Sequence, residues 1–164
     1  PQYDAEHPTY IAKVTKVKVI QDGETVTVGP LKLTAHLTPG HTPGSTAWTW
    51  QSCEKGECKN IVYADSLTAV SSDGFYYTGD ATHPDRTESF RASIAKVAGL
   101  PCDVVVSTHP GFTDTLQKLA ARTKDRNPFV EVGDCKAYAD GAARAFEKRI
   151  EKEREEKAAK ASKA

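Results

Sequence analysis

Residues 34 to 50 read Thr34-Ala-His-Leu-Thr-Pro-Gly-His-Thr-Pro-Gly-Ser-Thr-Ala-Trp-Thr-Trp50. Apolar and polar residues alternate in the runs 31–38 and 46–51, which predicts two strands. The connection between them contains two Pro-Gly pairs, so the chain bends sharply on both sides of His41. We therefore expect this imidazole to lie at the end of a strand, in a loop that is ordered before any ligand arrives.

Further strands extend outward from this stretch. Residues 11–20 and 24–28 are rich in β-branched side chains, which predicts two strands on the amino-terminal side. Residues 59–64 predict a strand antiparallel to residues 46–51, joined to it by a short turn. Residues 103–107 contain three consecutive valines, a pattern typical of a strand buried on both faces. The first part of the chain is therefore expected to be mainly β.

Helices are expected toward the carboxyl end. A helix over residues 86–98 begins with a capping box, and a short one covers residues 113–123. A longer helix over residues 134–150 presents apolar side chains at steps of three or four. Residues 66–84 are rich in Ser, Thr, Gly, Asp and Tyr, which predicts a long loop, and loops of this length are usually functional or disordered.

The length of 164 residues suits one domain with a substantial core. We expect residues 1–150 to form a layered α/β domain. Residues 151–164 consist mostly of Glu, Lys, Arg and Ala and predict a charged helical extension or tail with no stripe facing the core.

Charge and hydropathy narrow the range of partners. Lys and Arg number 22, as do Asp and Glu, so the formal net charge is zero. Nucleic acids and anionic membranes favour a concentrated basic surface. No apolar run approaches the roughly 20 residues that a membrane span requires. We therefore expect a small-molecule substrate and neither nucleic acid nor membrane as a partner.

Four cysteines allow three pairings, and spacing alone cannot choose among them. We favour Cys53–Cys58, which would pin a tight turn, and Cys102–Cys135, which would close a longer loop and stabilise the fold by roughly 3 to 4 kcal/mol. The alternative is four reduced thiols in the cytosol. Two disulfides would instead place the protein in an oxidising compartment, periplasmic or secreted.

A second histidine repeats the pattern around His41. In Val106-Ser-Thr-His-Pro-Gly111, His109 again follows a strand and precedes Pro-Gly. Zinc binds neutral imidazole nitrogen, and loops at strand ends can bring distant histidines together. The repeated pattern therefore makes His41 and His109 candidate zinc ligands.

Several motifs, in this order along the chain, resemble the metallo-β-lactamases of subclass B3. They are Thr34 to Trp50, Tyr63-Ala-Asp-Ser-Leu67, Leu100-Pro-Cys-Asp103, His109-Pro-Gly111 and Cys135-Lys-Ala-Tyr-Ala-Asp140. The resemblance runs from about residue 10 to about residue 150. It implies the αββα sandwich of that family, with two zinc ions between the sheets, and this chain is similar to the second, carboxy-terminal half.

The resemblance also implies roles for individual residues. His41 is similar to a ligand of the first zinc and His109 to a ligand of the second. Ser66 and Thr68 resemble residues that bind the carboxylate of a β-lactam antibiotic. The surroundings of Cys102 and Cys135 match the family's disulfide. No side chain acts as the nucleophile, because the resemblance implies attack on the β-lactam ring by a zinc-bound hydroxide.

One family motif, HxHxDH, does not occur in this sequence. Without it, each zinc keeps a single protein ligand, whereas catalytic zinc normally has three. The resemblance therefore implies that the complete enzyme hydrolyses β-lactams, and that this chain needs a missing N-terminal half, on the same gene or a separate chain. Alone, it should bind zinc weakly and hydrolyse nothing.

Three alternatives stay open. The first is another hydrolase of the same fold, a lactonase or thioesterase, in which an aspartate bridges the metals. Asp65 is one residue from that position, although strand alternation would turn it away if Ser66 faces the metals. The second is a catalytically silent fragment that binds its complementary half. The third is a binding module without metal, in which neither histidine matters.

Overall fold

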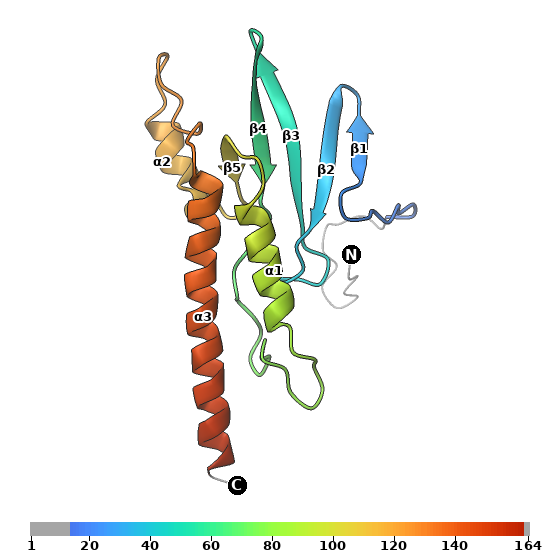
Figure 1. Cartoon of the computed structure of the whole chain (residues 1–164), viewed down its shortest axis with the longest axis vertical. Coiled ribbons are helices and arrows are strands. Elements are labelled where there is room, and N and C mark those ends of the chain that lie inside the picture. Colours follow the sequence, from blue (N-terminus) through green and yellow to red (C-terminus); the bar gives the residue numbers. More distant parts are fainter. Residues whose placement is uncertain (1–13, 163–164) are drawn as a thin grey trace.

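The structure, a computed structural model, describes residues 14–162. Helices lie against a single sheet with strand order β1-β2-β3-β4-β5 (Figure 1). The strands are β1 (Thr25–Val28), β2 (Leu31–Leu37), β3 (Thr46–Glu54), β4 (Glu57–Tyr63) and β5 (Val104–Val106). The helices are α1 (Thr87–Ala98), α2 (Thr115–Ala120), α3 (Asp134–Ala161) and the short 3-10 helix η1 (Pro110–Thr113). The expected α/β class is confirmed.

The strand directions place three strand ends together. Strands β1 to β4 pair antiparallel in sequence order, whereas β5 pairs parallel with β4. Strands β2, β4 and β5 therefore run in the same direction, and their carboxyl ends lie at one edge of the sheet. The loops that follow these three strands are the ones that carry the candidate site residues.

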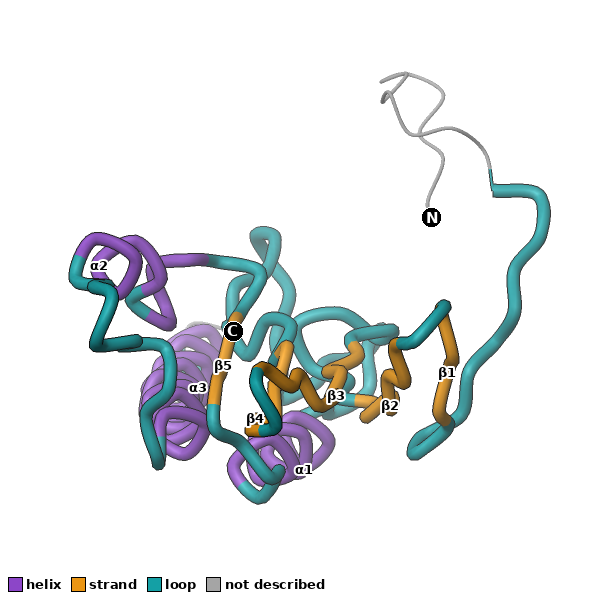
Figure 2. The backbone as a smooth tube through the Cα atoms, turned by 90° about the horizontal axis from the view of Figure 1, so that it is seen from above, coloured by secondary structure: helices purple, strands orange, loops and turns teal. Residues whose placement is uncertain are grey.

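One face of the sheet is covered by α1 and α3 (Figure 2). Ala47, Val62 and Val105 project from the strands into this layer, where they are almost completely buried. They belong to one apolar cluster with α1 and α3. The helix residues buried there include Phe90, Ile94, Val97, Ala139, Phe146 and Ile150. This layer is the core of the described chain and confirms the apolar stripe expected for residues 134–150.

The opposite face of the sheet is more open. Strand alternation and the observed register place Trp48, Trp50, Ile61 and Tyr63 on this face, and each is only half-buried. Val104 and Val106 of β5 are also half-buried, so the prediction that residues 103–107 are buried on both faces is wrong. Figure 2 shows the reason, because α1 and α3 both lie on the other side of the sheet.

Two disulfides fasten the sheet. Cys53–Cys58 closes the β3–β4 hairpin, with its two Cα atoms 4.0 Å apart. Cys102–Cys135 joins the residues before β5 to the first turn of α3, across 33 positions of sequence. Both favoured pairings are present, and the alternative of four reduced thiols is contradicted.

Residues 14–20 form no strand, so the predicted strand over residues 11–20 is wrong for the part that is described, while residues 11–13 lie outside the described residues. Val17 and Val19 are 71% and 76% exposed. β-Branched side chains favour an extended backbone, but a strand also needs a neighbour to take its hydrogen bonds. Here β1 pairs with β2, and the preceding segment is left without that neighbour.

Two helix starts differ from expectation. The capping box before α1 does not form, because Asp85 instead accepts a hydrogen bond from the Thr87 backbone N–H at 2.7 Å and Glu88 pairs with Arg91. The helix predicted over residues 113–123 is found only as the shorter α2, Thr115–Ala120, and Thr113 is instead the last residue of η1. Leu116 and Leu119 of α2 are both exposed, so this helix buries no apolar side chain in the core.

Helix α3 continues to Ala161, which fits the helical extension expected for residues 151–164. The expectation that this extension has no stripe facing the core is wrong. Glu153 is 1% exposed, and Lys157 contacts the loop after β4. A polar stripe of this kind escapes a search for apolar periodicity, because its burial depends on hydrogen-bond partners supplied by a distant loop.

Candidate metal centre

The candidate site lies at the sheet edge where β2, β4 and β5 end. His41 follows β2, Ser66 and Thr68 follow β4, and His109 follows β5. The sequence separates these residues by as many as 68 positions, from 41 to 109, but the shared strand direction collects them at one edge. The sequence-based expectation that both histidines lie at strand ends is therefore met by the structure.

The ring of His41 is held by the loop after β4. Its Nδ1 is 2.9 Å from the backbone carbonyl oxygen of Thr68 and 3.2 Å from the Thr68 Oγ1. A carbonyl can only accept, so Nδ1 carries the hydrogen, and in the neutral tautomer with this hydrogen the lone pair is on Nε2. Zinc-binding histidines are commonly oriented in this way, through a hydrogen bond from the nitrogen that does not touch the metal. His41 thus has the geometry of a preorganised ligand.

Ser66 supports this arrangement from within the protein. Its Oγ is 2.9 Å from Thr68 Oγ1 and lies 3.4 Å from the Thr68 backbone N–H. Ser66 is 2% exposed, whereas Thr68 is half-buried. In the described chain Ser66 therefore contacts Thr68, and Thr68 contacts His41. The assignment of Ser66 and Thr68 as substrate contacts stays a prediction.

His109 is more exposed than His41. It immediately precedes η1 with an extended backbone, and its ring lies edge-to-face against Phe112, with centroids 5.5 Å apart. Its backbone N–H lies 3.4 Å from Ser107 Oγ. That hydroxyl in turn donates to the backbone carbonyl of Asp65 at 2.8 Å. Hydrogen bonds therefore tie the end of β5 to the end of β4.

Asp65 is turned away from this edge. Its backbone is in the left-handed region, with φ of 52°, and its Oδ2 accepts a hydrogen bond from the Thr46 backbone N–H at 3.2 Å. Its carboxylate is therefore used to hold β3. Asp65 lies beyond Tyr63, the last residue of β4, so its left-handed backbone rather than strand alternation sets this orientation.

Sequence reasoning missed Tyr138, which lies on α3. Its hydroxyl is 3.2 Å from the Leu67 backbone N–H and 3.2 Å from Ser107 Oγ. One side chain thus links the loops after β4 and β5. The available signal was its position within the Cys135 to Asp140 motif, but its apolar helical spacing suggested only a core role.

Each of the two histidines suits zinc as a ligand, but the described residues do not supply a complete set of zinc ligands. Between residues 14 and 162, no group of three or more His, Cys, Asp or Glu side chains could hold a metal ion. Catalytic zinc normally takes three protein ligands. His41 and His109 therefore fit as single ligands, and further donors would have to come from outside the described residues. None of the helices in this part of the chain is both long and apolar enough to span a membrane.

No family model matches the sequence, but solved structures do. MEM-A1, a subclass B3 metallo-β-lactamase from a soil metagenome library, is 36% identical with a TM-score of 0.83, over 89% of this chain and 56% of that one. The metallo-β-lactamase SMB-1 is 42% identical with a TM-score of 0.78, over 85% of this chain and 53% of that one. MIM-1 from Novosphingobium pentaromativorans is 36% identical with a TM-score of 0.78, over 95% of this chain and 56% of that one.

The chain spans only a little more than half the length of each of these structures. Over most of its length the chain is therefore similar, in sequence and structure, to about half of the fold of subclass B3 metallo-β-lactamases.

Proposed function

We propose that the complete protein is a zinc-dependent β-lactamase, to which this chain supplies one histidine for each of two zinc ions. His41 would bind the first zinc and His109 the second. The observation that carries the proposal is the hydrogen bond from His41 Nδ1 to the Thr68 carbonyl, which leaves Nε2 free for a metal. The similarity to subclass B3 structures supports the same assignment.

The chain's own residues would orient ligands and substrate. The Thr68 carbonyl fixes the His41 ring, and the Ser66 hydroxyl holds the Thr68 side chain. When bound, zinc supplies a Lewis acid that activates water and stabilises negative charge on the attacked amide. The substrate carboxylate would be bound by Thr68 and, after a small movement of its buried hydroxyl, by Ser66. No side chain of the chain is needed as a nucleophile.

The open face of the sheet supports a partner, the N-terminal half of the fold. Trp48, Trp50, Ile61 and Tyr63 form an apolar surface that is only half-buried, and aromatic residues of this kind favour burial in an interface. Nearly half the length of the matched structures lies outside the match. We propose that this half, on the same chain or another, packs on the open face and brings the remaining zinc ligands.

Substrate assays on the complete protein test the function. We expect hydrolysis of nitrocefin that a chelator abolishes, and strong loss of that activity in His41→Ala and His109→Ala. His83→Ala is the matched control, because His83 is an exposed loop residue paired with Asp80. If nitrocefin is hydrolysed only at the background rate while a lactone or thioester is turned over rapidly, the proposal is wrong. The protein would then be a lactonase or thioesterase of the same fold.

Two other outcomes would identify the remaining alternatives. A complete protein that binds no zinc and keeps its function in both His→Ala variants would be a binding module without metal. A chain that binds the complementary half but restores no hydrolysis would be a silent structural fragment. The orientation of Asp65 toward Thr46 supports the β-lactamase over the hydrolases with a bridging aspartate.

The two disulfides support a periplasmic or secreted location for the protein. Such bonds persist in oxidising compartments and are rare in the cytosol. Fractionation of the producing cells, with a cytosolic marker as the control, would test this location.

A further inference from the structure

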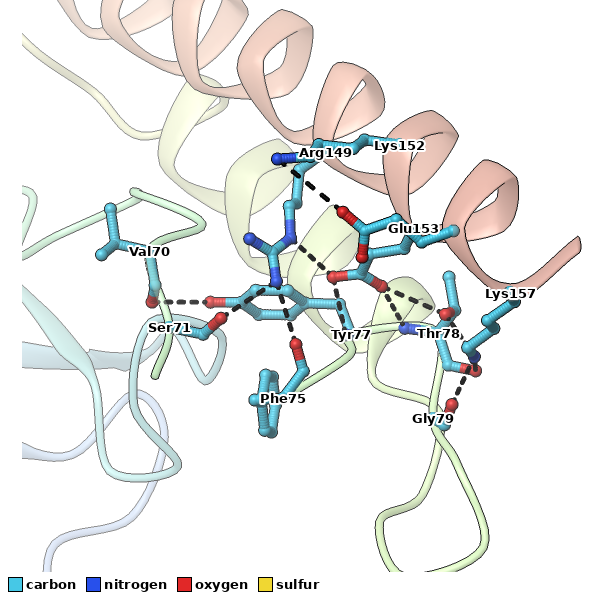
Figure 3. A network of polar contacts seen from close by, with 11 residues as sticks. Val70, Ser71, Phe75, Tyr77, Thr78, Gly79, Arg149, Lys152, Glu153 and Lys157 are labelled. Carbon is cyan, nitrogen blue, oxygen red and sulfur yellow. Dashed lines mark hydrogen bonds and ion pairs between the residues drawn. The ribbon is translucent and has the colours of Figure 1, made fainter. Parts of the chain in front are cut away.

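A buried carboxylate on α3 holds the loop that follows β4 (Figure 3). Glu153 is 1% exposed. Its carboxylate accepts hydrogen bonds from the backbone N–H groups of Tyr77 at 3.1 Å and Thr78 at 3.0 Å. The Thr78 hydroxyl and the Arg149 Nε complete the set, at 3.1 Å and 2.7 Å. Burying a carboxylate removes it from water at a high cost in free energy, which hydrogen-bond and ion-pair partners of this kind offset.

Arg149 and Tyr77 extend these contacts toward the candidate site. The Arg149 guanidinium donates to Ser71 Oγ at 3.0 Å and to the Phe75 carbonyl at 2.9 Å. The buried Tyr77 donates its hydroxyl to the Val70 carbonyl at 3.3 Å. Glu153, Arg149 and Tyr77, called here the loop clamp, thus fix both ends of the segment from Val70 to Thr78.

The clamped segment begins two residues after Thr68. Thr68 is the residue whose carbonyl accepts the hydrogen bond from His41 Nδ1. Ser66 holds Thr68 from its amino-terminal side. On its carboxyl side Ala69 is partly buried against the core and Val70 is exposed. The clamp at Val70 and Ser71 is therefore the polar support nearest to the Thr68 carbonyl on this side.

We propose that Glu153 and Arg149 are positioning residues for His41, acting through the loop clamp and the Thr68 carbonyl. They touch neither histidine nor any substrate. By fixing Val70 and Ser71, they keep the Thr68 carbonyl in place, which in turn fixes the ring orientation and the Nδ1–H tautomer of His41. The inference rests on the proposed function only in treating His41 as a zinc ligand.

Nuclear magnetic resonance of the metal-free 164-residue chain tests this inference without any enzyme assay. The variant is Glu153→Gln, which keeps the size of the side chain and removes its charge. We expect a mixed His41 tautomer, under alkaline conditions that keep imidazoles neutral, and Nδ1–H exchange with water at least about tenfold faster, because one hydrogen bond to a charged group is worth roughly that factor. The wild type should show one tautomer.

The matched control is Glu156→Gln on the same helix. Glu156 is exposed and forms a long ion pair with Lys152, with 3.8 Å between the Lys152 Nζ and the Glu156 Oε1. This variant should leave the His41 signals unchanged. Faster backbone exchange over residues 71–79 in Glu153→Gln, with an unaltered His41 tautomer and exchange rate, would overturn the inference and leave the clamp a purely structural feature.

A second variant covers the case in which Glu153→Gln fails to fold. Tyr77→Phe removes only the hydroxyl that holds Val70 and keeps the ring, which packs on Phe90 and Phe146. We expect a smaller change of the His41 signals in the same direction. A folded Tyr77→Phe chain with wild-type His41 signals would contradict the inference. Because these readouts need neither zinc nor a β-lactam, they are independent of the outcome of the activity assays.

Discussion

Gly40 shows how tightly the loop with His41 is fitted to the helix layer. A Cβ atom built on Gly40 would lie 2.0 Å from Cδ2 of Phe90. Phe90 is fully buried in the core, so its ring has little room to move. The residue before the candidate ligand therefore has to be glycine for lack of space, and the loop is held against α1 by this close approach.

We expect Gly40→Ala to destabilise the chain by about 1–3 kcal/mol or more, because a methyl group forced into a packed core displaces its neighbours. Gly44→Ala is the matched control from the same loop, since nothing lies within 4 Å of a Cβ at Gly44. Urea unfolding of both variants measures the difference. Equal stability of the two would contradict the packing seen here.

Much of the site could be predicted from single residues, because strand-end histidines next to Pro-Gly are recognisable in a sequence. The contact between His41 and Thr68 could not, since it joins residues 27 positions apart through a backbone carbonyl. Neither could the links made by Tyr138. Interactions with backbone groups leave almost no pattern in the sequence, because any residue type offers a carbonyl.

At the level of elements, α3 combines two kinds of burial. Phe146 and Ile150 bury apolar side chains against the core, and one turn later Glu153 buries a charge. Burial alone raises the pKa of the Glu153 carboxyl, but the hydrogen bonds from Arg149, Thr78 and Tyr77 outweigh it and hold that pKa below its ordinary value. The burial of the apolar part of α3 could be predicted from the spacing of its apolar residues. The burial of Glu153 could not, because its partners lie in a loop with no regular spacing.

This lowered pKa predicts a dependence of stability on pH. An unfolded glutamate has a pKa of about 4.3, so the stabilisation from ionised Glu153 is fully present above that pH and is lost as the pH falls through the lower, folded pKa. The free energy of unfolding should therefore differ most between wild type and Glu153→Gln at neutral pH. The difference should shrink in acid. A difference that stays constant down to pH of about 2 would exclude this linkage.

The two disulfides should contribute unequally to the free energy of unfolding. In the chain-entropy description, the Cys102–Cys135 bond, which spans 33 positions, is worth roughly 3 to 4 kcal/mol and the short Cys53–Cys58 loop about 2 kcal/mol. Paired Cys→Ser variants, compared by urea unfolding, measure both.

A mild reductant should reduce Cys53–Cys58 before Cys102–Cys135, because both residues of the first bond are exposed whereas Cys135 is buried. Mass spectrometry after alkylation shows which bond is reduced first. Earlier reduction of Cys102–Cys135 would mean that burial does not control the access of the reductant.

The sheet has one face covered by α1 and α3, called here the finished face, and one open face (Figure 2). The finished face was predictable from the apolar periods of its strands and helices. The extent of the open face was not, because a valine-rich strand reads the same whether its second neighbour is on this chain or elsewhere. Residues 14–20 illustrate the same limit, since their β-branched pattern finds no neighbouring strand to pair with.

We expect the 164-residue chain alone to retain less than stoichiometric zinc after dialysis against a mild chelator and to hydrolyse no β-lactam. The reason is the donor set, since the described residues bring no three ligands together. Metal analysis and a nitrocefin assay measure both properties. Tightly held zinc in one-to-one ratio, lost in His41→Ala, would show that the chain completes a site by itself.

The open face has a further consequence, an optical one. The sequence contains two tryptophans, Trp48 and Trp50, and both lie on that face. Indole fluorescence shifts to shorter wavelength when water around the ring is replaced by apolar neighbours. Binding of a partner to the open face should therefore shift the tryptophan emission maximum of the chain to shorter wavelength. Assembly can then be followed by intrinsic fluorescence, without a label.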